Sequence, residues 1–184
     1  DPLRGYARLG YGNNGNIDAR LGYLFALSKR DELGILGRFD GMNTKLNYAT
    51  PEMRGKEWKS RFYSTNISLN YKHSFDKIVM GINGSFGSDV FKYQPYSSNL
   101  NYSNETDRQH HTKAEIGVTL ASLDNSLPLN FTAEAGYRLF DRKYLSTWDY
   151  SPYTENTVYA HANMQGTINE EQHIGIKIDF DGFI

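Results

Sequence analysis

The sequence predicts an all-β protein whose strands follow one another in an antiparallel up-and-down meander. Two patterns predict this fold. Long segments alternate apolar and polar residues with a period of two, and the connections between them alternate between short and long. Successive side chains of a strand point to opposite faces of a sheet, so the alternation describes strands with one apolar and one polar face. No apolar run approaches the roughly 18 residues of a transmembrane helix.

The alternation is clearest in residues 64–75, STNISLNYKHSF, where Ile67 and Leu69 share one face and Asn66 and Ser68 share the other. We expect about 8–10 strands and no helix. The other segments with the same period are 5–12, 17–28, 33–46, 78–87, 110–121, 129–139, 157–168 and 173–180.

The connections between these segments have their own rhythm. Short, charged or turn-forming links alternate with longer polar ones at 47–62, 92–109 and 141–155. The exception is NNGN at 13–16, a tight turn at the end where long links are expected. Neighbouring strands with short turns at one end and long loops at the other are the layout of an outer-membrane barrel. The short links are 28–32, 76–77, 124–128 and 169–172.

Composition narrows the class of protein further. The chain has 184 residues, and no Pro/Ser-rich linker or charge block divides it, so we expect one β-barrel domain, or a fragment of one, over 1–184, with no plug domain. It opens on Asp1-Pro2 without a signal peptide, which predicts a mature protein or a fragment. Twenty basic and 21 acidic residues argue against a nucleic-acid-binding surface. The absence of cysteine excludes disulfides and thiolate metal sites.

A membrane barrel turns the apolar face of its strands outward, whereas a soluble β-barrel or sandwich turns it inward. Three features favour an apolar face that points outward, as in a membrane barrel. Most alternating segments reach the length of about 9–11 residues that a membrane-crossing strand needs. Tyr and Phe cluster near the ends of the apolar stripes, where interfacial girdles lie. Opposite charges recur on the polar face, where buried ions need partners. The expected pairs are Asp18 with Arg20, Arg38 with Asp40, Lys113 with Glu115, and Glu134 with Arg138.

The period of two assigns side chains to the two faces. We expect a polar lumen to be lined by Arg8, Arg20, Arg38, Asp40, Glu115, Glu134, Arg138, His161 and Lys177. We expect lipid to contact Leu21, Tyr23, Ile67, Leu69, Tyr71, Ile82, Ile116, Val118, Phe131, Ile174, Ile176 and Ile178.

Four segments that together span most of the chain carry a resemblance. They are GYARLGYGNNGNIDARLGYLF (5–25), WKSRFYSTNISLNYKHSFDK (58–77), TDRQHH (106–111) and YAHANMQGTINEEQHIGI (159–176). With them the chain resembles outer-membrane β-barrel proteins of the Bacteroidota, specifically TonB-dependent-receptor-like barrel segments. The resemblance implies an architecture more than a substrate. The chain departs from a full transporter in lacking a plug domain and an energy-coupling box near its start, and about nine strands is an odd number.

The densest group of metal-ligating residue types is TDRQHH at 106–111. In a strand, His110 and His111 point to opposite faces and do not chelate one ion together. Asp107 or Asp149 with a histidine could activate water, but no nucleophile motif accompanies them. We therefore expect no catalytic, metal or cofactor site.

Two long links rich in Tyr and Asn, 93–104 and 148–159, have the residue types that stack on sugars or contact proteins, or that pack over a barrel mouth. The basic stretch 53–61 has charges for lipopolysaccharide phosphates, although a solvated loop is the expectation for it.

The function expected from these features is non-enzymatic. It is transport or permeation of small solutes by an outer-membrane barrel. The expected partners are outer-membrane lipid and lipopolysaccharide, with other outer-membrane or periplasmic energy-coupling proteins as a further option. The first alternative is a surface binding or adhesion module that uses long extracellular loops. The second is a soluble lipocalin-like binder.

Overall fold

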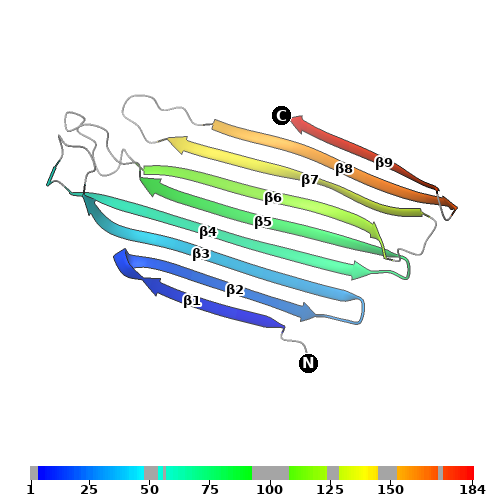
Figure 1. The fold of residues 1–184 in the computed structure, drawn as a ribbon, viewed down its shortest axis with the longest axis horizontal. Helices are drawn as coiled ribbons and strands as arrows, with labels where there is room; N and C mark the ends of the chain where they lie inside the picture. The colour runs from blue at the N-terminus through cyan, green and yellow to red at the C-terminus, as the bar shows by residue number, and fades with distance from the viewer. Residues whose placement is uncertain are drawn as a thin grey trace.

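The predicted meander is confirmed. The computed structural model describes residues 4–47, 54–55, 57–92, 108–123, 129–144, 153–169 and 172–184. Within these described ranges, nine strands form one antiparallel sheet in which every strand pairs with its neighbours in sequence (Figure 1). Their bounds are β1 Gly5–Gly12, β2 Asn16–Ala26, β3 Asp31–Asn47, β4 Glu57–Ser74, β5 Ile78–Lys92, β6 Arg108–Ser122, β7 Leu129–Tyr144, β8 Tyr153–Asn169 and β9 Gln172–Phe183.

The sheet is open among the described residues, because β1 and β9 each pair along one side only and occupy its two opposite edges (Figure 1). The expected rhythm of connections is present. The strand ends joined by links 27–30, 75–77, 123–128 and 170–171 lie at one end of the sheet, and the strand ends joined by links 48–56, 93–107 and 145–152 lie at the other. We call these the short-turn end and the long-loop end.

Several strands extend further than the sequence pattern predicts. β4 begins at Glu57 instead of residue 64, and β7 continues to Tyr144 instead of residue 139. In both of these strands the added residues lie toward the long-loop end. There both faces carry polar side chains, so backbone pairing continues where the apolar–polar alternation is no longer visible.

The exceptional turn at 13–16 depends on a glycine. It forms the 3-10 turn η1 (Asn13–Gly15), in which Gly15 has a φ of 65°. L-residues with a side chain disfavour this left-handed conformation. A Cβ on Gly15 would also lie 2.9 Å from the carbonyl oxygen of Asn43 on β3.

The strand register sorts the side chains into two faces. All twelve residues predicted to contact lipid share one face, and all nine predicted to line a lumen share the other. We call these the apolar face and the polar face. On the apolar face, Leu69 is 48% exposed, and Ile116 and Ile178 reach 60% and 59%.

The described residues build no apolar core of the kind found in a β-sandwich. Among the described residues, the one large side chain that is fully buried is Tyr159, and it lies on the polar face. No helix in the described part of the chain is long and apolar enough to cross a membrane.

Candidate functional site: the charged polar face

Charged side chains on the polar face are joined in pairs from β1 to β9. Two of the predicted pairs along a strand are present: Arg20 bonds Asp18 at 3.1 Å, and Arg38 bonds Asp40. Arg8 on β1 also approaches Asp18, at 3.5 Å. Residues two apart on a strand share a face, and long side chains bridge that spacing easily.

The other two predicted pairs were wrong, because the partners lie on neighbouring strands. Lys113 on β6 pairs with Asp89 on β5 at 3.6 Å, rather than with Glu115. Arg138 on β7 pairs with Glu115 on β6 at 3.4 Å, rather than with Glu134. Glu115 and Arg138 are directly opposite in the register, where cross-strand side chains approach most closely.

Tyr159 of β8 is the centre of the most tightly packed part of the polar face. Its hydroxyl donates a hydrogen bond to Glu115, 2.8 Å away on β6, and lies 3.2 Å from Glu134 on β7. The guanidinium of Arg138 stacks over its ring, 3.9 Å from the centroid. The ring crosses two strands because Gly136 and Gly117 leave room beneath it. One aromatic side chain therefore connects three strands.

A smaller charged group joins β8 and β9 on the polar face, where His161 is directly opposite Asp179. Asp179 receives Lys177 at 2.8 Å and the Nδ1 atom of His161 at 3.1 Å. Both basic residues were predicted on the polar face, whereas their shared carboxylate was not singled out.

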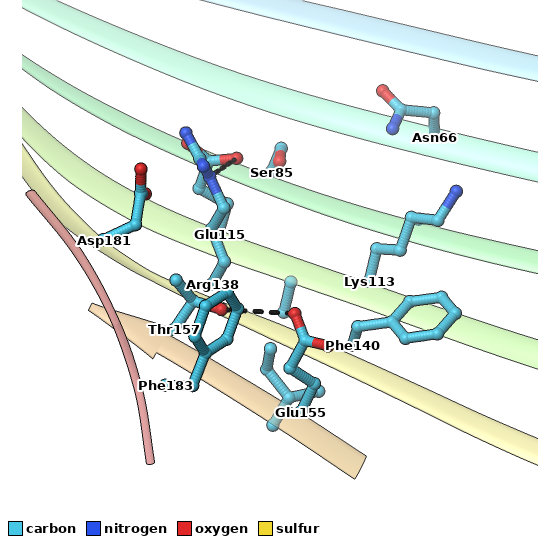
Figure 2. Close-up of a pocket in the computed structure, with 13 residues that line it drawn as sticks. Asn66, Ser85, Lys113, Glu115, Arg138, Phe140, Glu155, Thr157, Asp181 and Phe183 are labelled. Atoms are coloured by element: carbon cyan, nitrogen blue, oxygen red, sulfur yellow. Dashed lines mark hydrogen bonds and ion pairs between the residues drawn. The ribbon is translucent and has the colours of Figure 1, made fainter. Parts of the chain in front are cut away.

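Glu115 and Arg138, which both contact Tyr159, also line a pocket of about 380 Å³ on the polar face (Figure 2). Its lining residues come from six consecutive strands, β4 to β9, which requires the sheet to curve toward the polar face. Phe140 and Phe183 supply aromatic walls. The charged lining residues are Lys113, Glu115, Arg138, Glu155 and Asp181.

The charges of this pocket do not balance. Its two cations, Lys113 and Arg138, are each paired with a carboxylate. Glu155 accepts hydrogen bonds from two neutral hydroxyls, those of Tyr153 at 2.6 Å and Thr157 at 3.4 Å. Asp181 receives no ion pair from the described residues. The pocket thus holds more negative charge than its own cations neutralise.

His110 and His111 lie on opposite faces of β6, as predicted. His110 approaches the hydroxyl of Ser88 at 3.0 Å on the apolar face, while His111 packs edge-on against Phe91 and Phe140 on the polar face. Within the described ranges, no three His, Cys, Asp or Glu side chains are arranged to hold a metal ion. Asp107, Asp149 and the tyrosine-rich segments 93–104 and 148–152 lie outside the described residues.

Sequence reasoning missed three important members of the site: Tyr159, Asp89 and Asp181. Asp89 and Asp181 lie near the ends of the alternating segments. A single carboxylate there, with no opposite charge two residues away, does not indicate a site from the sequence. Tyr159 had a signal, since it is an aromatic residue at a polar position within an alternating segment. An aromatic side chain that covers a cross-strand glycine is a known way to stabilise a sheet. Its glycine partner could be found only through the register.

No protein-family model matches this chain. A search of curated proteins also finds no significant match.

Proposed function

We propose that this chain forms the wall of an outer-membrane β-barrel, or part of a larger one, and that small polar solutes pass along its polar face. The observation that carries the proposal is that the pattern of burial is the reverse of that in a soluble protein. Among the described residues, the one large side chain that is fully buried is a tyrosine next to carboxylates, while many Leu, Ile and Val side chains on strands from β1 to β9 are exposed. Soluble monomers typically expose apolar patches of only a few hundred Å². An apolar face that stays exposed on strands from β1 to β9 is therefore not typical of a soluble monomer.

The physical chemistry of a bilayer explains both faces at once. Hydrocarbon solvates Leu69, Ile116 and Ile178 as well as a protein core does, so these residues need no cover from the chain itself. Charged groups next to a narrow aqueous lumen keep partial hydration and neutralise one another in pairs. The strands have 8–18 residues, and most exceed the 9–11 that span the hydrocarbon region.

The curvature toward the polar face supports passage in preference to a flat binding surface. A sheet that curves around its charged side and carries an open pocket there has the geometry of a channel wall. The similarity of four segments to TonB-dependent-receptor-like barrel segments is consistent with this proposal. Energised uptake, as opposed to passive permeation, is not part of it.

The proposal is tested by measuring whether the chain folds only in the presence of detergent or lipid vesicles. We expect the protein to need detergent or vesicles for folding, and to migrate differently on a gel before and after heating. After insertion into a planar bilayer, we expect discrete current steps. A folded, monodisperse protein in detergent-free buffer would overturn the membrane assignment. Stable insertion without conductance would overturn passage and favour the adhesion alternative.

A further inference from the structure

Two phenylalanine side chains line the pocket of the polar face, at positions where the alternation otherwise places polar residues. Phe140 on β7 is directly opposite Glu155 on β8. Phe183 on β9 is directly opposite Thr157 on β8, and it is 73% exposed. An exposed phenylalanine on a charged face gains nothing from water. The two rings therefore indicate that the pocket receives a ligand with apolar groups.

The carboxylate of Glu155 is oriented beside these rings but not neutralised. Its Oε2 atom accepts a hydrogen bond from the hydroxyl of Tyr153 at 2.6 Å, and its Oε1 atom accepts one from Thr157 at 3.4 Å (Figure 2). A carboxylate has about four lone-pair positions, so both oxygens can accept a further donor. Because both hydroxyls are neutral, the negative charge of Glu155 has no counterion among the described residues.

Asp181 of β9 contributes a second carboxylate to the same pocket. It receives no ion pair within the described part of the chain. The cations of the pocket already have partners, since Lys113 contacts Asp89 at 3.6 Å and Arg138 contacts Glu115 at 3.4 Å. A solute that enters therefore meets two carboxylates without an ion pair, whereas both lysine and arginine are paired.

Aromatic walls next to such carboxylates suit one class of solute. A positively charged nitrogen that carries alkyl groups is attracted by the carboxylates, and its alkyl groups pack on the ring faces. An anion would meet uncompensated negative charge, and a neutral sugar would leave that charge unneutralised. Within the described ranges, no three His, Cys, Asp or Glu side chains are arranged to hold a metal ion. The volume of about 380 Å³ is that of a small-molecule site.

We propose that the pocket binds an organic ammonium ion between Phe140 and Phe183, with Glu155 as its main counterion and Asp181 as the second. This inference rests on the proposed passage of solutes along the polar face, and it adds a saturable site and a class of solute to that function. The ammonium group completes the charge balance of the pocket, and its alkyl groups cover the two exposed rings.

The experiment is a calorimetric titration of the folded chain in nonionic detergent with choline. We expect one saturable site. The uncharged analogue of choline, in which carbon replaces the nitrogen, has the same shape and should bind weaker by about tenfold or more. Equal affinity for choline and its uncharged analogue would overturn the proposal.

Two variants test the two parts of the site. Glu155→Gln removes the charge and should weaken choline binding about tenfold. Phe140→Leu keeps an apolar side chain without the ring and should weaken it about fivefold. The matched control is Glu32→Gln, because Glu32 lies on the polar face of β3 and pairs with Lys72 at 3.4 Å. It should leave choline affinity unchanged.

Gel migration before and after heating shows that each variant is folded, and Asp181→Asn replaces Glu155→Gln if that variant does not fold. An unchanged choline affinity in the folded carboxylate variant would overturn the proposal. Glucose and potassium ions are added as competitors, and displacement of choline by either would overturn the assignment to an organic ammonium ion. Conductance is recorded separately in planar bilayers. Choline binding without conductance removes passage but supports the site, whereas conductance without choline binding removes the site alone.

Discussion

Tyr159 lies so close to Gly136 on the neighbouring strand that a Cβ at position 136 would be 2.5 Å from the tyrosine oxygen. The same added Cβ would be 2.6 Å from the carbonyl oxygen of Ile116. The tyrosine ring therefore packs directly against the backbone of Gly136. This contact fixes how β7 and β8 lie beside each other.

Gly136→Ala should destabilise the folded chain by about 1–3 kcal/mol, because an extra methyl in a filled space forces side chains or backbone to move. Unfolding by urea in detergent micelles measures this change. Gly37→Ala is the control, since no atom lies within 4 Å of a Cβ built at that position. If the two variants unfold at the same denaturant concentration, the close contact at Gly136 has no energetic importance.

Tyr159→Phe and Tyr159→Ala should differ in size of effect. The phenylalanine variant keeps the ring under Arg138 but loses the hydrogen bond to Glu115, at a cost of about 1–2 kcal/mol. The alanine variant also empties a fully buried space, and truncating large core aromatics costs about 3–5 kcal/mol. Urea unfolding followed by gel migration checks both. Equal losses in the two variants would mean that the ring itself contributes nothing.

A charge on the apolar face should have a different effect from one on the polar face. Ile116→Arg places a guanidinium in the proposed hydrocarbon layer, at an expected cost of about 2–4 kcal/mol. Ser85→Arg places the same group on the polar face of the adjacent strand, near Glu115, where we expect little change. The measurement is the fraction of chain that folds into vesicles. A soluble protein with a hydrated apolar face would tolerate Ile116→Arg as well as Ser85→Arg.

The unbalanced carboxylates of the pocket should make the pathway favour cations. Charged side chains that line a pore set its ion selectivity. Glu155→Gln and Asp181→Asn should each lower the permeability of potassium relative to chloride, measured as the reversal potential in a salt gradient. Asp76→Asn serves as the single-charge control, because that carboxylate pairs with Arg30 at the short-turn end. A shift in the control as large as in the two pocket variants would remove the pocket from the permeation path.

Much of the fold could be predicted from the sequence because it depends on local geometry. A period of two assigns side chains to faces without knowledge of any neighbour, so Ile67 and Arg138 were assigned to faces that match the register. Short charged links force sequential strands to pair, so the meander followed as well. The ends of the strands were predicted less accurately, since β4 and β7 extend beyond the predicted bounds. Beyond the apolar band, the ladder from Glu57 onward depends on backbone hydrogen bonds that leave no pattern in side-chain polarity.

The sequence by itself determined the strand order and the composition of each face, because both follow from residues close together in the chain. Only the tertiary structure decided which side chains meet across strands. Arg138 pairs with Glu115, Tyr159 covers Gly136, and Lys92 faces Arg108, although each pair is separated by 16 or more residues. A shift of register would replace every one of these contacts. The physical reason is that the pleat fixes direction locally, whereas register is a property of two strands together.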